Sequence, residues 1–146
     1  TISQIQAQST LQVNPPQIYI HINENNLGEP TANPYIQPVI SEFFSRSFSA
    51  NFVETEDADI LISGTVNTRA VSDMPNEWGL YQVFGDLTIS ISNGKTGETL
   101  LEKTLTKVQG SDFQSNREAA NQSLKKISEK ITQDFLPEII EVIVGL

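Results

Sequence analysis

The chain has 146 residues, 18 of them acidic and nine basic, so its formal net charge is −9. Nucleic acids and anionic lipids attract basic patches. The only adjacent basic residues are Lys125 and Lys126, so neither kind of partner is expected. The absence of cysteine excludes disulfides, thiolate catalysis and zinc–thiolate sites. No apolar run approaches the ~20 residues that a membrane-spanning helix needs.

The first 16 residues differ in composition from the rest of the chain. They are rich in Gln, Ser and Thr and end in two prolines, which predicts a flexible lead-in over 1–16. Alternatively, Ile2, Ile5, Leu11 and Val13 could add an edge strand. Residues 17–146 are long enough to form a single α/β domain with its own core. Because the chain begins with Thr1, we expect that a signal peptide, a lipoprotein anchor or another domain precedes it.

The first half of the domain predicts a strand, a helix and a short second strand. Residues 18–22 alternate Ile with polar side chains, as in a half-buried strand, and residues 23–34 have the Asn, Gly and Pro content of turns. From residue 35 the pattern is helical, with Pro38 in the first turn. The expected buried stripe contains Ile36, Val39, Ile40, Phe43 and Ser47, and is widened by Phe44 and Phe48. Residues 52–53 indicate the short strand.

The second half predicts three long strands and a closing helix. Residues 60–70 and 80–92 have strand periodicity, with a bulge at Gly85, and a hairpin turn at 93–97 leads into a third strand at 98–108. Ser115 and Glu118 form a capping box that starts the helix. Pro137 is expected to break or restart it. The aliphatic segment after Pro137 continues the helix stripe, so we expect it to pack on its own sheet.

The predicted fold class is therefore α/β, of the α+β kind. We expect a small mixed β-sheet of four to five strands with two main helices packed on it. The predicted order of elements is β-α-β-β-β-β-α.

The residues that could carry chemistry each have a simpler interpretation. Gly94-Lys95-Thr96 resembles the end of a phosphate-binding loop, but Ile89 stands where the motif needs Gly, which favours a hairpin turn. His21, the single histidine, has no acid or nucleophile beside it in the sequence. The acidic stretch at 54–59 lacks the spacing of a calcium-binding loop. No catalytic residue, metal site or cofactor is predicted.

The loop at 72–81 has the composition of a binding surface. It contains Met74, Trp78 and Tyr81, and exposed Trp and Tyr side chains on loops contribute disproportionately to binding. These three residues are the predicted contacts with a protein partner. The other interpretation is that Trp78 covers the core.

Four short motifs resemble one group of bacterial envelope proteins. They are DADILISG at 57–64, the opening strand and Asn/Glu-rich turn at 18–28, the hairpin LTISISNGKTGE at 87–98, and the Ala pair at 119–120. They are similar to motifs of the flagellar assembly protein T, the LPP-type lipoproteins and the curli secretion lipoprotein. The resemblance covers residues 17–136. It implies a mixed sheet with helices packed on it, in a periplasmic or lipid-tethered protein that acts through protein contacts.

These features favour a non-enzymatic protein-interaction or assembly module of the bacterial cell envelope. Its expected partner is an envelope protein, and it could also form a homo-oligomer. Because the chain has no lipobox cysteine, membrane contact is expected only through a tether outside it. Three alternatives stay open: a cytoplasmic protein, a ring-forming or secretion-associated subunit, and a hydrolase whose active site combines Glu54, Asp57, Asp59 and Asp86.

Overall fold

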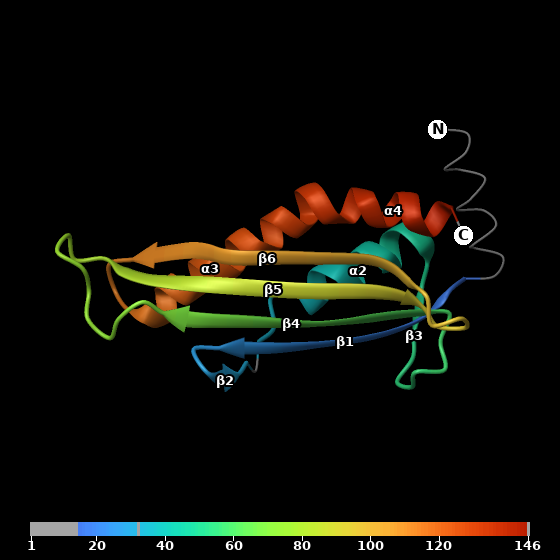
Figure 1. Cartoon of the computed structure of the whole chain (residues 1–146), viewed down its shortest axis with the longest axis horizontal. Coiled ribbons are helices and arrows are strands. Elements are labelled where there is room, and N and C mark those ends of the chain that lie inside the picture. Colours follow the sequence, from blue (N-terminus) through green and yellow to red (C-terminus); the bar gives the residue numbers. More distant parts are fainter. Residues whose placement is uncertain (1–14, 32, 146) are drawn as a thin grey trace.

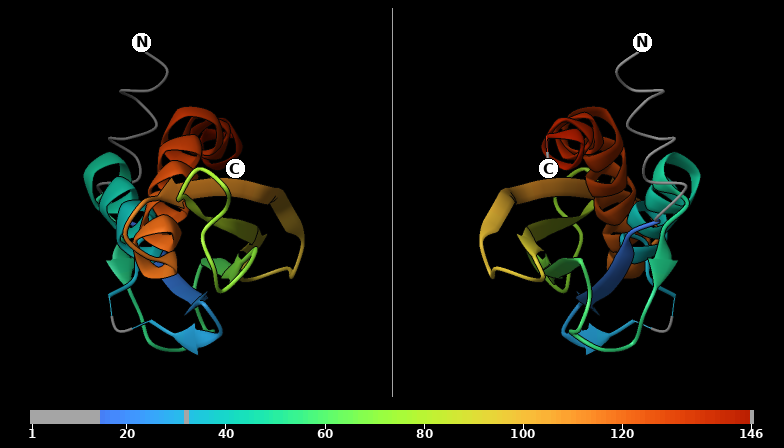
Figure 2. Two further views of the ribbon diagram at one scale, coloured as in Figure 1. Left: turned by 90° about the vertical axis from the view of Figure 1, so that its left-hand side faces the viewer. Right: turned by 90° about the vertical axis from the view of Figure 1, so that its right-hand side faces the viewer.

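A computed structural model describes residues 15–31 and 33–145 of the chain (Figure 1). Most of the predicted lead-in at 1–16, with its alternative edge strand, lies outside these residues, since residues 1–14 are not among them. Figure 2 looks along the strands and shows the helices gathered on one face of a twisted sheet, with no helix on the other face. The fold class is α+β, which confirms the prediction.

The described residues form a sheet of six strands in the order β2-β1-β4-β5-β6, with β3 paired to β1. β1 runs parallel to β4, while the β4–β5 and β5–β6 pairs are antiparallel. Parallel neighbours need a crossover connection, and helix α2 provides it. The strands are β1 (Gln17–Asn26), β2 (Glu29–Pro30), β3 (Asn51–Phe52), β4 (Ile60–Ala70), β5 (Tyr81–Asn93) and β6 (Thr99–Asp112).

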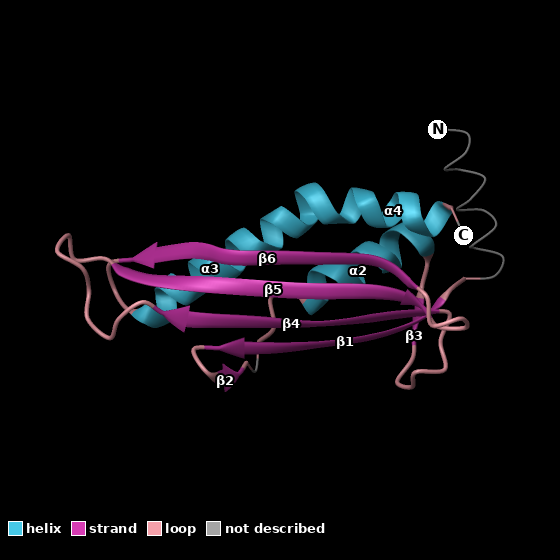
Figure 3. Cartoon of the chain, in the orientation of Figure 1, coloured by secondary structure: helices cyan, strands magenta, loops and turns pink. Residues whose placement is uncertain are grey.

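Two helical units cover the sheet (Figure 3). The first is α2 (Gln37–Phe48), and the second joins α3 (Asn116–Lys130), a π-helical turn (Ile131–Phe135) and α4 (Leu136–Val144). The predicted capping of α3 is confirmed, because the Ser115 hydroxyl accepts a 3.1 Å hydrogen bond from the backbone N–H of Glu118. Pro137 stands in the first turn of α4, where its missing N–H does no harm, so the helix restarts there as predicted.

The N-terminus of α2 is held by a buried carboxylate on β1. Glu24 is only 8% exposed, and its side chain accepts hydrogen bonds from the backbone N–H groups of Tyr35, Ile36 and Gln37 at 2.8, 3.1 and 3.2 Å. Gln37 is the first residue of α2, Ile36 is its N-cap and Tyr35 precedes it, and N–H groups at a helix start have no intrahelical acceptors. Glu24 therefore fixes where α2 begins relative to the sheet.

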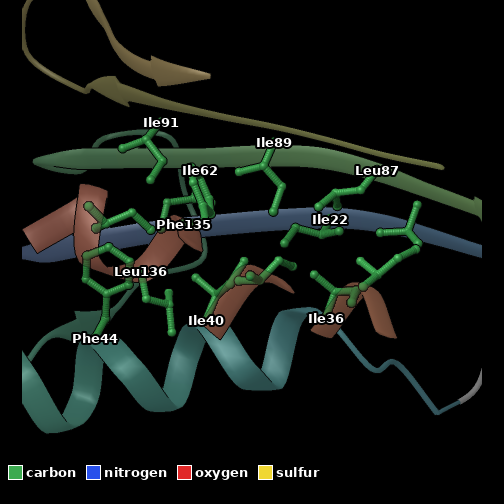
Figure 4. Packing of buried hydrophobic residues seen from close by; sticks show 14 of the residues in the cluster. Ile22, Ile36, Ile40, Phe44, Ile62, Leu87, Ile89, Ile91, Phe135 and Leu136 are labelled. Atoms are coloured by element: carbon green, nitrogen blue, oxygen red, sulfur yellow. The ribbon is translucent and has the colours of Figure 1, made fainter. Parts of the chain in front are cut away.

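The core lies between the helices and one face of the sheet (Figure 4). Strand residues such as Ile62 and Ile89 meet Phe44 of α2 and Phe135 of the second helical unit, and all four side chains are at most 1% exposed. The buried residues of α2 are Ile40, Phe44 and Phe48, so the predicted stripe was displaced: Phe43 and Ser47 are only half-buried. Ile139 and Ile143 are buried, which confirms that the C-terminal segment packs on its own domain.

The strand irregularity predicted at Gly85 belongs mainly to the neighbouring strand. Gly85 pairs with Val108 and Leu87 pairs with Leu105, so β6 carries the extra residue. Lys107, in this bulge, has a φ of 52°, and its N–H donates to Asp86 at 2.9 Å. Gly85 itself is required for close packing, since an added Cβ would lie 2.3 Å from the Oγ of Ser123 on α3.

Candidate protein-interaction surface

Exposed apolar side chains gather at one end of the molecule. Four of the large hydrophobic residues that are exposed in the described chain come from two neighbouring connections, β4–β5 and β6–α3. Figure 1 shows the β4–β5 connection projecting beyond the ends of its strands. We call these four residues the apolar tip: Val71 (53% exposed), Met74 (71%), Trp78 (71%) and Phe113 (71%).

Two contacts show that the connections that form the apolar tip lie against each other. The side-chain amide of Asn116 donates a 2.9 Å hydrogen bond to the carbonyl oxygen of Ser72. The Phe113 ring lies beside Gly79, 3.9 Å from where a Cβ on that glycine would stand. The two connections that carry the apolar tip therefore lie side by side, although its residues are up to 42 positions apart in the sequence.

The loop that carries Trp78 is ordered by its own hydrogen bonds. The Asn76 side-chain oxygen accepts from the backbone N–H groups of Trp78 and Leu80 at 3.0 and 2.9 Å. The Asn76 backbone also donates to Leu80 at 2.8 Å and accepts from Gly79 at 2.9 Å. Gly79 has a φ of 81°, which an L side chain would strain. A loop backbone ordered in this way lowers the entropy cost of binding through Trp78.

The charged residues within the segments that build the apolar tip are all acidic. The two segments that build it, 71–80 and 111–115, contain Asp73, Glu77 and Asp112 and no lysine or arginine. Arg69, just before the first segment, forms an ion pair with Asp86, and its guanidinium lies 5.6 Å from the centre of the Phe84 ring. Arg69 is therefore engaged on the sheet, and Arg117, the first basic residue after the second segment, lines a pocket beside the β1–β2 turn. Asp73, Glu77 and Asp112 give the apolar tip an acidic border within its own two segments.

The structure separates the three predicted contact residues. Met74 and Trp78 belong to the apolar tip, and the interpretation that Trp78 covers the core is wrong, because its side chain is 71% exposed. Tyr81 is half-buried and packs against a small cluster of Val83, Ala119 and Ala120. Sequence reasoning missed Val71 and Phe113. Phe113 could have been noticed as a large apolar residue in an otherwise polar turn, SDFQS.

Asp86 lies far from the acidic turn at 54–59 with which a hydrolytic site would have to combine it. Asp59 accepts a 2.9 Å hydrogen bond from the backbone N–H of Gln17, and it precedes Ile60 at the start of β4. Asp86 pairs with Asn67, seven residues further along that strand. At about 3.3 Å per residue, the eight positions from Asp59 to Asn67 place Asp59 and Asp86 roughly 26 Å apart along the sheet.

Other single residues considered for chemistry stand apart as well. His21 is exposed on the helix-free face of the sheet, where its ring stacks against Tyr19 with the centres 6.5 Å apart. Residues 93–97 form the predicted hairpin turn, and Lys95 makes a 3.6 Å ion pair with Asp57. Among residues 15–31 and 33–145, no three His, Cys, Asp or Glu side chains are grouped so that they could hold a metal ion.

A polar pocket of about 560 Å³ lies beside the β1–β2 turn and α3. Arg117 and Asn121, one helical turn apart, line one side of it, and the turn itself is fixed by a 2.8 Å hydrogen bond from the Leu27 N–H to Thr68. Small-molecule sites are usually lined mainly by apolar side chains, with a few polar groups for orientation. This lining is mostly polar, so the apolar tip is the stronger candidate for function.

Comparison with known proteins identifies a shared fold but does not assign the chain to a family. No family model matches the chain, and neither does any curated protein. Among solved structures, protein XCC0632 of Xanthomonas campestris, from family DUF330, has a TM-score of 0.52 and 11% identity, covering 87% of this chain and 85% of its own. Lipoprotein GNA1162 of Neisseria meningitidis has a TM-score of 0.47 and 9% identity, covering 82% and 100%. The C-terminal domain of LpoB from Salmonella enterica has a TM-score of 0.41 and 10% identity, covering 71% of this chain and 93% of its own.

At these identities the likeness shows a shared fold alone. The chain therefore has the fold of the Xanthomonas protein, while the narrower resemblance to flagellar, LPP-type and curli proteins stays a prediction. Within the described part of the chain, every helix is too short or too polar to cross a membrane.

Proposed function

We propose that the chain is a non-enzymatic interaction module of the bacterial cell envelope, and that the apolar tip is its contact surface. The envelope assignment rests on the sequence motifs at 18–28, 57–64 and 87–98, which resemble envelope proteins. The interaction assignment rests on the apolar tip. The scattered positions of His21, Asp59 and Asp86 favour a role without catalysis.

The observation that carries the proposal is the exposure of Trp78 on a loop ordered by Asn76. Isolated exposed apolar residues are ordinary, but a continuous group of large ones on a monomer marks an interaction site. Trp is also the residue type that contributes most to binding when a partner covers it. Folding does not require this arrangement, because neither Trp78 nor Phe113 contributes to the buried core.

Site-specific photocrosslinking tests the proposal. A benzophenone amino acid replaces Phe113 in the apolar tip, and in a matched variant it replaces Thr96, an exposed residue in the turn at the other end of the sheet. Both proteins are irradiated in an envelope extract of the organism that makes them. We expect a discrete heavier adduct from position 113 and none from position 96. No adduct at 113, or the same adducts from both positions, would contradict the proposal.

A further inference from the structure

We infer that the apolar tip fits a protein surface with an apolar socket and a basic rim, rather than a lipid bilayer or a second copy of this chain. The inference rests on the proposed function and adds the chemistry of the partner. It follows from how charge is distributed around Trp78 and Phe113.

The apolar part of the contact requires a concave partner. Met74 and Trp78 lie on a projecting loop, and Phe113 stands beside that loop on a separate turn. Side chains that are 71% exposed can bury most of their surface only if a partner encloses them from several sides. A flat surface would leave much of that apolar area in water.

The acidic border determines the charge of the partner. Asp73 and Glu77 flank Met74 and Trp78 directly in the sequence, and Asp112 precedes Phe113. Closing a socket over the apolar residues removes water from these carboxylates, which is costly unless charged hydrogen-bond donors replace it. Lysine or arginine side chains around the socket would supply those donors and would also steer the encounter.

A bilayer does not meet this requirement. Segments that insert into the interface usually combine apolar residues with lysine or arginine, which bind anionic headgroups. The border of the apolar tip is acidic instead, and the whole chain carries −9. An anionic leaflet would therefore repel the same residues that would have to approach it.

A second copy of the chain does not meet it either. In a symmetric contact between two apolar tips, each partner would bring Asp73, Glu77 and Asp112 to the same interface. No basic residue in segments 71–80 or 111–115 could neutralise them. Like charges that face each other across an interface select against that pairing.

The experiment uses the crosslinker at position 113 together with charge reversal. One variant combines D73K and E77K at the apolar tip. The matched control combines E54K and E56K, which makes the same change in net charge in an exposed turn at the other end of β4. We expect the yield of crosslinked adduct to fall at least tenfold in the tip variant and less than twofold in the control. For the crosslinker protein without charge reversal, raising the salt concentration from about 0.05 to 0.5 M should also reduce the adduct yield severalfold.

Two further measurements test the excluded partners. Trp78 is the single tryptophan of the chain, so its fluorescence reports directly on the apolar tip. Vesicles of phosphatidylcholine and phosphatidylglycerol should leave its emission maximum unchanged, and sedimentation at rising concentration should show one constant mass. An emission shift to shorter wavelength, a dimer that forms through the tip, or an adduct that ignores both charge reversal and salt would overturn the inference. In the last case the adduct persists and the proposed function stands, whereas complete absence of an adduct at 113 refutes the proposed function itself.

Discussion

The hydroxyl of Ser123 on α3 donates a 2.6 Å hydrogen bond to the backbone carbonyl oxygen of Val108 on the edge strand β6. Ser123 is fully buried, and a helix can approach a strand this closely only where neighbouring side chains are absent. Gly85 and Gly110 provide that space, because a Cβ on either would stand 2.3 Å or less from an atom of α3. Helix α3 therefore packs directly against the sheet at Gly85, Gly110 and Ser123.

This packing predicts that Gly110→Ala destabilises the domain more than Gly85→Ala does. A Cβ on Gly110 would meet backbone atoms, 2.0 Å from the carbonyl oxygen of Ala119 and 2.3 Å from the nitrogen of Ser123, so the whole helix must shift. A Cβ on Gly85 would meet the side-chain ends of Ser123 and Ile127, which can move. We expect Gly110→Ala to lower the free energy of unfolding, measured in urea, by about 3 kcal/mol or more, which is the upper part of the range for overpacking. Equal effects of the two substitutions would show that α3 is not held by its backbone.

Much of the fold could be predicted from the sequence because local signals mark most elements. Alternation of apolar and polar residues located the long strands, and Ser115 with Glu118 located the start of α3. The displaced stripe of α2 shows the limit of this reasoning. The adjacent apolar pairs at 39–40 and 43–44 allow two neighbouring faces, and the choice between them depends on how α2 is fixed to the sheet, where Glu24 of β1 accepts from the N–H of Ile36. That contact spans 12 residues and leaves no local pattern.

The Glu24 anchor predicts a large cost for removing one side chain. Glu24→Ala should leave three N–H groups at the start of α2 without their acceptor, of which that of Ile36 is buried and the other two are part-buried. An unsatisfied buried group costs about 1–3 kcal/mol. Partial rescue by water lowers the sum, so we expect a loss of about 3 kcal/mol in the free energy of unfolding. Glu42→Ala in the same helix removes an exposed ion pair with Arg46 and should cost under about 0.5 kcal/mol. Similar unfolding midpoints for the two variants would contradict the anchor.

The candidate site was harder to predict than the fold. The sequence drew attention to Met74 and Trp78 through composition, but it did not reveal that they are exposed. Phe113 joins them only because β6 runs antiparallel to β5, which brings the two ends together. Tyr81 shows the converse: it has the same kind of side chain as a binding residue, yet it packs against Val83 because it begins β5 rather than belonging to the loop.

The C-terminal helix predicts a contrast between two adjacent residues. Ile143 is 4% exposed in the core cluster, whereas Val144 is 37% exposed. Ile143→Ala should lower the free energy of unfolding by about 2–4 kcal/mol, since large-to-small changes in a core leave a cavity. Val144→Ala should change it by less than about 0.5 kcal/mol. Thermal unfolding measures both, and a larger effect at position 144 would mean that α4 presents a different face to the sheet.

The last prediction separates binding from stability at the loop itself. Trp78→Ala should leave the free energy of unfolding within about 0.5 kcal/mol of the unchanged protein, because the side chain is 71% exposed and only its backbone N–H serves the loop. The same substitution should weaken partner binding by about 2 kcal/mol or more, roughly a thirtyfold loss of affinity. Tyr81→Ala should behave in the opposite way, losing about 2 kcal/mol or more of stability through its contacts with Val83, Ala119 and Ala120. Urea unfolding of both variants is the measurement. If Trp78→Ala lowered stability as much as Tyr81→Ala, Trp78 would be a structural residue and the apolar tip would lose its central contact.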